Sequence, residues 1–420
     1  MTDRIQNTRP LTQIITGKQN KIRATFFCLS LFILLIACSP QVNENEPAQA
    51  NNDQAMPTHT PVQQEPIEIA PMATKSSDFD AYLDTLADAG FSGTILIAQQ
   101  GQIVADKAYG YANIADEVPI TTQTVFDSGS LSKQFTAAAI LHLQEQVHLQ
   151  LDDTLADFFE NVPADKADIT IHQLLTHTAG FPGYVYIDDF TATSRDEAQE
   201  MAFQAELLSE PGTEHFYSDT GYGILAIIVE LVSGQSFQTY LHENLFAPAG
   251  MENTGFYNDP RWDNLTVANG YNNDTDFGTA ATRPGPYWGL LGFGGVLTTS
   301  GDLYKWGQGL KAHTILTEES VNKLFTPYVR EFEGEDSFYG YGWVVLDTEE
   351  YGRVIFHDGA TDSHNAIMIM AEDHDTTIIV MSNRIDETAD REVFYGTDTG
   401  IAVGRSYLSN DFGILPEYAQ

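Results

Sequence analysis

The stretch FDSGSLSKQFTAAAILHL, residues 126–143, places a serine before an apolar run with helical spacing and a lysine three residues after that serine. Residues three apart lie on one face of an α-helix, so Lys133 can reach the Ser130 hydroxyl if Ser130 occupies the first turn. The unpaired N–H groups of a first turn suit a developing oxyanion. A serine hydroxyl needs a neighbouring base to act as a nucleophile. The pattern therefore predicts a nucleophile and its base, with a helix-capping serine beside a surface lysine as the structural alternative.

Two further stretches supply partners for this serine. PGTEHFYSDTGYGIL, residues 211–225, contains Tyr217-Ser218-Asp219 on a loop that enters a helix, and VIFHDGATDSHNA, residues 354–366, contains His357-Asp358-Gly359 at the end of a strand. In this order the three motifs resemble Ser-x-x-Lys, Tyr-x-Asn and Lys/His-x-Gly of the serine β-lactamase and penicillin-binding protein superfamily. The tyrosine of the second motif favours the class C branch. Flanking stretches such as LLTHTAG and GFGGVLTTSGDLYKWGQGL also resemble this branch, and the resemblance spans roughly residues 91–383.

The resemblance implies a role for each residue of the first two motifs. Ser130 is expected to be acylated and Lys133 to take its proton. Tyr217 is expected to relay that proton to the leaving group, for which nearby cations should lower the pKa of its phenol. Asp219 departs from the pattern, because asparagine is usual at this position. An amide can donate a hydrogen bond to a substrate carbonyl, whereas an ionised carboxylate can only accept one. We expect the Asp219 carboxylate within a few ångströms of Lys133, where it favours the ammonium form of the base.

The third motif is expected to line the cleft. His357 stands where many class C β-lactamases have lysine, although it could also be a strand-end histidine. Gly359 would let the substrate lie against its strand. The N–H groups of Ser130 and Ala360 would form the oxyanion hole. The resemblance implies no metal and no cofactor, and no spacing requires His357, Asp358 and His364 to bind a metal. His172 and His177 are interpreted as structural residues.

The order of the predicted elements indicates an α+β fold. DFDAYLDTLADAG reads as a helix that ends at Gly90, and two strands follow around a turn at residues 100–102. Signals between residues 126 and 253 are mostly helical. Three short strands, GRVIFHDGA, NAIMIMAED and TTIIVMSN, come after Gly292, and a last helix is predicted for residues 387–408. We expect an antiparallel sheet built from both chain ends and flanked by helices. A mainly helical subdomain, about residues 126–285, would be inserted, with the site at the junction.

The N-terminal segment has the features of an export signal. Basic residues precede an uncharged apolar run, residues 24–37, which ends in Leu-Ile-Ala before Cys38 and resembles a bacterial lipobox. Residues 1–37 are predicted to be a lipoprotein signal peptide, with Cys38 lipidated, and an ordinary signal or an uncleaved anchor is the alternative. Residues 38–76 are polar and rich in Pro, Gln and Asn and are expected to be a disordered tether. Residues 77–420 would form the catalytic domain. Ser39 favours the outer membrane, with the domain facing the periplasm.

Charge and motifs together limit the function. The 59 acidic and 20 basic residues give a formal charge of −39, which argues against nucleic acid as a partner and against docking on anionic lipid. The expected partner is a small molecule or short peptide, and the oligomeric state stays open. The sequence predicts a serine hydrolase that cleaves an ester or amide through an acyl-enzyme, as a peptidase, esterase or β-lactamase. The alternative is a non-catalytic protein on the same fold that recognises penicillin or acts as an envelope scaffold.

Overall fold

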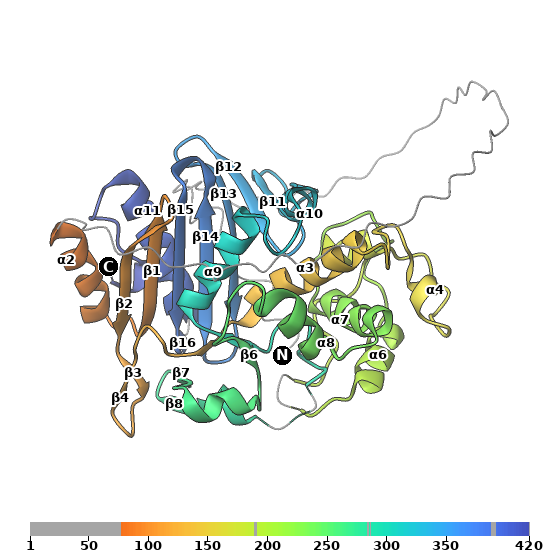
Figure 1. The fold of residues 1–420 in the computed structure, drawn as a ribbon, viewed down its shortest axis with the longest axis horizontal. Coiled ribbons are helices and arrows are strands. Elements are labelled where there is room, and N and C mark those ends of the chain that lie inside the picture. Colours follow the sequence, from red (N-terminus) through yellow and green to blue (C-terminus); the bar gives the residue numbers. More distant parts are fainter. Residues whose placement is uncertain (1–76, 189–190, 284, 286, 388–391, 420) are drawn as a thin grey trace, which may run out of the picture.

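An eight-stranded antiparallel sheet organises the computed structural model, which describes residues 77–188, 191–283, 285, 287–387 and 392–419 (Figure 1). The strand order is β10-β11-β12-β13-β14-β15-β1-β2. The strands are β1 (Gly93–Gln99), β2 (Gln102–Tyr109), β10 (Val329–Arg330), β11 (Ser337–Tyr339), β12 (Val344–Thr348), β13 (Gly352–Ala360), β14 (Asn365–Ala371) and β15 (Thr376–Ser382). Strands from both chain ends thus share one sheet, as the sequence predicts. The β1–β2 hairpin turns at Gln100 and Gly101, both with positive φ, as a two-residue hairpin turn requires.

Alternating side chains divide the core between the two faces of this sheet. Ile95 and Ile97 of β1 pack in one cluster with α2 (Ser77–Asp88) and α11 (Tyr395–Ser409), while Leu96 and Ala98 belong to the other. That second cluster includes buried residues of α9 (Ser300–Lys311) and α3 (Ser132–Glu145). The sheet is therefore covered by helices on both faces, which accounts for strands that are buried along most of their length.

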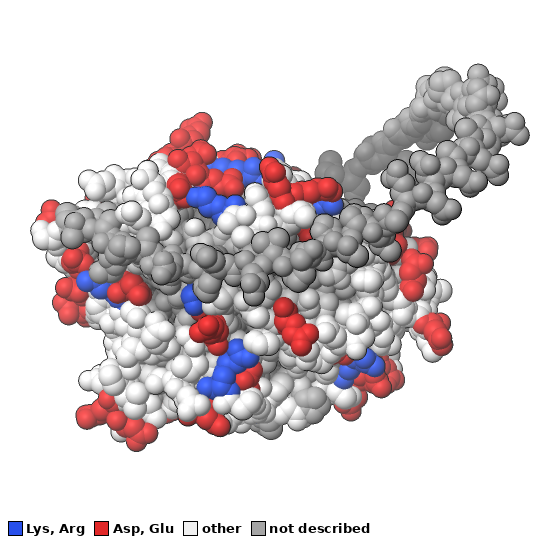
Figure 2. Space-filling model, viewed as in Figure 1, with Lys and Arg blue, Asp and Glu red and all other residues white. Residues whose placement is uncertain are grey.

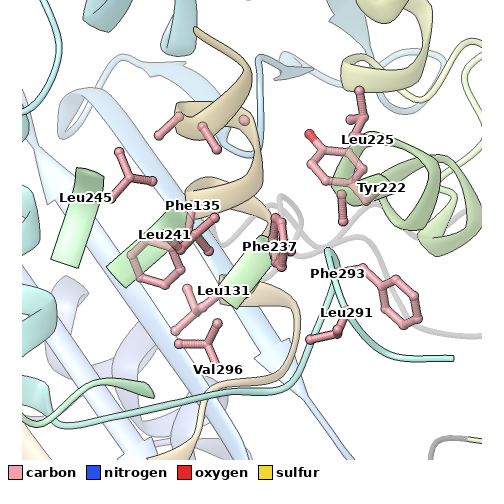
Figure 3. Packing of buried hydrophobic residues seen from close by; sticks show 14 of the residues in the cluster. Leu131, Phe135, Tyr222, Leu225, Phe237, Leu241, Leu245, Leu291, Phe293 and Val296 are labelled. Atoms are coloured by element: carbon pink, nitrogen blue, oxygen red, sulfur yellow. The ribbon is translucent and has the colours of Figure 1, made fainter. Parts of the chain in front are cut away.

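The helical subdomain lies beside the sheet (Figure 1). Its further helices are α4 (Leu155–Phe158), α5 (Ile171–Leu175), α6 (Arg195–Gln204), α7 (Asp219–Ser233), α8 (Phe237–Leu241) and a π-helical turn (His242–Phe246). Helix α3 runs through its centre, and every residue from Leu131 to Leu141 is buried. Figure 3 shows Leu131 and Phe135 among the side chains of α7, α8 and the 291–296 segment. Because α3 is packed on all sides, the residues at its start are held firmly.

Three predictions about elements need correction. The subdomain expected to be mainly helical contributes strands to two small sheets, and after α8 it has only short helical turns. One sheet consists of β5 (Phe126–Asp127), β9 (Val296–Thr298) and β6 (Gly255–Phe256), and the other of β17 (Glu392–Phe394), β16 (Arg384–Glu387), β7 (Asn269–Asn272) and β8 (Thr275–Thr279). The last helix begins at Tyr395 rather than at residue 387, because β16 and β17 precede it. Helices α9 and α10 (Glu318–Leu324) lie where strands were expected to resume. A short hairpin of β3 (Tyr111–Asn113) and β4 (Val118–Pro119) completes the fold.

The predicted signal peptide, Cys38 and the tether lie outside the described residues. In the part of the chain that is described, no single helix has the length and hydropathy of a membrane span. Helix α7 and residues 237–246 reach these values only as a pair, and they are bent by 80° relative to each other. Figure 2 shows acidic side chains spread over the visible face, with the few Lys and Arg side chains lying among them.

Candidate active site

The turn that carries Ser130 is fixed by the strands around it. Ser130 lies in a 3₁₀ turn (Gly129–Leu131) directly before α3 and is partly exposed. The Ser128 hydroxyl donates to the Val296 carbonyl at 2.7 Å, and the Gly129 N–H donates to the Asp127 carboxylate at 3.2 Å. Gly129 has a φ of 52°, which a residue with a side chain rarely adopts. The turn therefore presents the serine hydroxyl at the surface of an otherwise buried segment.

Lys133 is fully buried beside this hydroxyl. Its Nζ lies 3.0 Å from Ser130 Oγ, as the three-residue spacing predicts, and 3.4 Å from the Phe293 carbonyl. The Asp219 carboxylate lies 2.6 Å from the same Nζ. The Tyr217 ring is close as well, with its centroid 4.6 Å from Nζ. A buried cation is retained only when it is paired and hydrogen-bonded, and these contacts meet that condition.

Asp219 is directed at Lys133 by the start of α7. Ser218 caps this helix: its hydroxyl accepts from the Gly221 N–H at 3.2 Å and donates to the Pro182 carbonyl at 2.7 Å. The Asp219 N–H donates to the Gly183 carbonyl at 2.8 Å. The expectation of a carboxylate within a few ångströms of the base is confirmed.

His177 contacts Tyr217 and the backbone on both sides of it. The Phe216 N–H donates to the His177 carbonyl at 2.9 Å, and the Ser218 N–H donates to His177 Nδ1 at 3.0 Å. The imidazole also packs against the phenol ring, with centroids 4.4 Å apart. Burial lowers the pKa of His177 well below its ordinary value, so the ring is neutral and Nδ1 can accept. These contacts position the tyrosine directly before Ser218, the residue that caps α7.

The expected lowering of the Tyr217 pKa is wrong. Burial raises the pKa of the phenol well above its ordinary value, and the Asp219 carboxylate raises it further, while a hydrogen bond with Ser130 opposes the shift. Lys133, whose Nζ lies over the Tyr217 ring, is paired with Asp219. Tyr217 is therefore a neutral hydroxyl in this site and not a standing phenolate.

The third motif lies on β13 and packs against the 3₁₀ turn Gly129–Leu131 that carries Ser130, here called the nucleophile turn. A Cβ atom added to Gly359 would lie 2.1 Å from the Ser128 carbonyl oxygen and 2.7 Å from the Ser130 nitrogen. One added to Gly129 would lie 2.6 Å from the Ala360 nitrogen. Both positions thus require glycine, and the close approach brings together the backbone nitrogens of Ser130 and Ala360, the pair expected to form the oxyanion hole. Ala360 itself is exposed.

His357 is buried and neutral. Its Nδ1 lies 2.5 Å from the Asp358 carbonyl, which can only accept, so Nδ1 carries the proton. Nε2 then accepts from the Tyr339 hydroxyl at 3.0 Å. Burial, together with the Lys133 charge, lowers the pKa of His357 to about 3. The histidine therefore supplies no positive charge to the site, unlike the lysine expected in many class C β-lactamases.

Sequence reasoning did not identify Tyr339 or the Phe293 carbonyl as part of the site. Tyr339 precedes Gly342, whose φ of 76° allows a close approach to the backbone of Lys133 and Gln134. The glycines next to aromatic residues in this stretch are a signal that the sequence offers. They do not reveal which distant part of the chain the stretch contacts. His172 lies elsewhere, with Nδ1 2.7 Å from the Tyr341 hydroxyl, as a structural residue would. Among the described residues, no group of three or more His, Cys, Asp or Glu side chains is arranged to hold a metal ion.

Comparison with known proteins agrees with this geometry. The family model described as Beta-lactamase matches residues 79–395. The chain belongs to the β-lactamase family. Penicillin-binding protein 4* of Bacillus subtilis (strain 168) is 32% identical over 336 residues, which cover 76% of this chain and 73% of that protein. A putative D-alanyl-D-alanine carboxypeptidase of Escherichia coli (strain K12) is 28% identical over 360 residues, 73% of this chain and 82% of that protein.

Solved structures show the same fold. The octameric penicillin-binding protein homologue from Pyrococcus abyssi has a TM-score of 0.69 and 25% identity, over 81% of this chain and 78% of its own. The D-amino acid amidase from Ochrobactrum anthropi SV3 has a TM-score of 0.67 over 79% of this chain and 98% of its own, and at 21% identity it shows the fold alone. The predicted α+β architecture and the resemblance to this superfamily are confirmed.

Proposed function

We propose that this β-lactamase-family protein is a serine hydrolase that cleaves an ester or amide through an acyl-enzyme on Ser130. The observation that carries the proposal is the 3.0 Å contact between Lys133 Nζ and Ser130 Oγ, made inside a buried site that opens at the serine. A base within hydrogen-bond reach of a hydroxyl is the arrangement that nucleophilic catalysis requires. Family membership supports the same reaction class.

The reaction follows from the positions of these groups. Lys133, as the neutral amine, takes the hydroxyl proton while Ser130 Oγ bonds to the carbonyl carbon. The N–H groups of Ser130 and Ala360 stabilise the oxyanion. Tyr217 passes a proton to the leaving group as its bond to the carbonyl carbon breaks. Water then releases the acyl group from Ser130 and restores the serine.

The finer activity is a D-Ala-D-Ala carboxypeptidase, D-aminopeptidase or esterase rather than a dedicated β-lactamase. Two observations support this choice. His357 replaces the cationic lysine and is neutral, and Asp219 replaces a hydrogen-bond donor with an acceptor. Relatives named as penicillin-binding proteins and carboxypeptidases point the same way.

One observation favours the non-catalytic alternative. The ion pair between Lys133 and Asp219 stabilises the ammonium form, which cannot accept a proton. A protein that only recognises its ligand would tolerate this pair, whereas a hydrolase must break or neutralise it. The arrangement of Ser130, Lys133 and Tyr217 supports the hydrolase, because a binding protein has no need of all three.

Covalent labelling separates the two functions. The full-length protein is incubated with a fluorophosphonate or a fluorescent penicillin, and peptide mass spectrometry locates the adduct. We expect an adduct on Ser130, none in Ser130→Ala, and labelling slowed about 100-fold or more in Lys133→Ala. Near-normal labelling of Lys133→Ala would remove the role given to the lysine. A panel of nitrocefin, p-nitrophenyl esters and D-amino-acid amides then identifies the bond cleaved.

A further inference from the structure

Asp127 is a buried acid that the proposed reaction does not use. It lies three residues before Ser130, at the end of β5, and its side chain is 0% exposed. Removing a carboxylate from water is costly unless hydrogen-bond donors replace the water. The donors that hold Asp127 therefore indicate which part of the structure it serves.

Two donors from separate parts of the chain reach this carboxylate. The Gly129 N–H donates to Oδ1 at 3.2 Å, and the Tyr257 hydroxyl donates to Oδ2 at 2.5 Å. The first contact joins an aspartate side chain to the backbone two residues later, a turn that this residue type favours. The second has the short length of a hydrogen bond between a hydroxyl and a carboxylate. Because each oxygen has its own partner, the carboxylate group cannot rotate without breaking both hydrogen bonds.

Tyr257 is itself fixed by its surroundings. It is buried and directly follows β6, which pairs with β9 in the same small sheet as β5. The Arg283 guanidinium lies over its ring, with Cζ 5.4 Å from the centroid. The Tyr287 ring packs edge-on against it, with centroids 5.1 Å apart. The hydroxyl therefore reaches Asp127 from a ring that is packed on several sides.

Gly129 transmits the position of Asp127 to the nucleophile. Its φ is 52°, and a Cβ added to it would lie 2.6 Å from the Ala360 nitrogen. The N–H of Gly129 is held by Asp127, and its Cα is in close contact with β13. The next N–H along the chain belongs to Ser130 and is one of the two expected oxyanion donors. Fixing Gly129 therefore fixes the direction in which this donor points.

We propose that Asp127 is a positioning residue for the oxyanion hole, which directs the Ser130 N–H through Gly129. The inference rests on the proposed hydrolase function of Ser130. An oxyanion donor stabilises the transition state only if it points to where the negative charge develops. The substrate carbonyl carries no full charge before attack and depends less on this donor. Loss of the Asp127 hydrogen bonds should therefore lower kcat and leave KM nearly unchanged.

Two substitutions of Asp127 separate hydrogen bonding from packing. Asp127→Leu keeps the approximate size of the side chain but removes both acceptors, so kcat for a p-nitrophenyl ester should fall about 10- to 100-fold. Asp127→Asn keeps an oxygen for the Gly129 N–H, and its amide nitrogen can donate to the Tyr257 oxygen. We expect Asp127→Asn to recover most of kcat in steady-state measurements with the full-length protein.

Phenylboronic acid reports on the oxyanion hole without turnover. Ser130 Oγ bonds to boron while its proton passes to Lys133, and boron becomes a tetrahedral anion with a hydroxyl oxygen in the oxyanion hole. Transition-state analogues gain affinity from contacts that the substrate makes only in the transition state. The inhibition constant of phenylboronic acid should therefore rise in Asp127→Leu by about the factor by which kcat falls, and Asp127→Asn should restore it.

Tyr257→Phe tests the same inference with a smaller change, in case Asp127→Leu does not fold. It removes one hydroxyl and keeps the ring, and we expect kcat to fall and the inhibition constant to rise about 3- to 10-fold. Tyr395→Phe is the matched control. The Tyr395 hydroxyl also donates to an aspartate, Asp386, at 2.8 Å, but its ring packs in the cluster with α2 on the other face of the large sheet. This variant should leave both quantities unchanged.

The outcomes separate this inference from the hydrolase itself. Equal losses of kcat in Asp127→Leu and Asp127→Asn overturn the inference. So does a rise in KM without a fall in kcat, or the same behaviour of Tyr257→Phe and Tyr395→Phe. In each of these cases a fluorophosphonate adduct on Ser130 of the unmodified protein leaves the hydrolase intact. If the unmodified protein forms no adduct and binds no phenylboronic acid, both proposals are wrong.

Discussion

Asp219 stands where the resemblance leads us to expect asparagine, and its carboxylate contacts the Lys133 amine at 2.6 Å. The opposite charge stabilises the ammonium form, while the proposed reaction needs the neutral amine. Activity should therefore rise toward alkaline pH. Asp219→Asn removes the negative charge, so the acidic limb of kcat/KM should move to lower pH, as a pH profile with an ester substrate will show.

The new amide of Asp219→Asn can also donate to a substrate carbonyl. Turnover of amides or β-lactams should then increase relative to turnover of esters. An acidic limb that stays in place or moves upward would leave Asp219 without an electrostatic role. Asp196→Asn, at an exposed acid of the α6 first turn, is a suitable control for the loss of one charge.

His177 is a second residue whose role is testable. It has a φ of 57° and binds the chain on both sides of Tyr217. His177→Leu should reduce kcat about 10- to 100-fold with little change in KM, because Tyr217 loses its position rather than its contact with the substrate. It should also lower the free energy of unfolding by about 1–3 kcal/mol, since the buried Ser218 N–H loses its acceptor.

Asparagine at position 177 provides the rescue variant. Its side-chain oxygen can replace Nδ1 as acceptor, and asparagine tolerates a left-handed backbone better than leucine. We expect His177→Asn to recover most of kcat and of the stability, measured by steady-state kinetics and urea unfolding. If His177→Asn and His177→Leu lose kcat equally, the imidazole contributes something other than this hydrogen bond.

At the scale of elements, the contact between β13 and the nucleophile turn is the feature most sensitive to one added methyl group. Gly359→Ala would place Cβ 2.1 Å from the Ser128 carbonyl, so strand and turn must separate. We expect kcat to fall about 100-fold or more as the oxyanion donors move apart, and the free energy of unfolding to fall by about 1–3 kcal/mol. Ester hydrolysis and denaturant unfolding measure the two effects.

Gly301→Ala is the matched control for this substitution. Gly301 lies in the first turn of α9, and the nearest atom to an added Cβ is the Thr299 hydroxyl at 3.8 Å. Alanine there should leave kcat unchanged and increase stability by up to about 1 kcal/mol, because alanine is the better helix former. Similar losses in both variants would show that β13 does not depend on its glycine.

Helices and strands could be predicted from the sequence where the apolar residues recur with the spacing of one of these two structures. Strand β13 was predicted with its observed bounds, and the helix before Gly90 was recognised by its apolar spacing. Helix α9 was missed because its three glycines weaken the helical signal, and β16 and β17 are short strands stabilised by distant partners. In the site, Ser130 and Lys133 were predictable from local spacing. Tyr339 and the Phe293 carbonyl depend on tertiary contacts that no local pattern encodes.

At the scale of the whole molecule, the remaining prediction concerns attachment. We propose that the protein is exported and held at the outer membrane by lipid on Cys38, facing the periplasm, on the basis of the apolar run before this cysteine. Cys38→Ser should abolish lipidation and signal processing. Fractionation and intact-mass analysis should then show no mature lipidated form. A processed, detergent-requiring species in this variant would place the anchor elsewhere, and Cys28→Ser serves as the control.

Because strands from both ends of the chain share one sheet, this sheet can be completed only late in folding. Gly93 of β1 pairs with Ser382 of β15, and the Ser382 hydroxyl donates to the Ser92 carbonyl at 2.7 Å. A ribosome delivers these partners almost three hundred residues apart, so the β1–β2 hairpin waits with an unpaired edge until nearly the whole chain has been made. Contacts so distant in sequence slow folding. A chain that completes its largest sheet last stays unfolded for most of its synthesis, and the export proposed above requires such an unfolded chain if it runs through a narrow translocation pore.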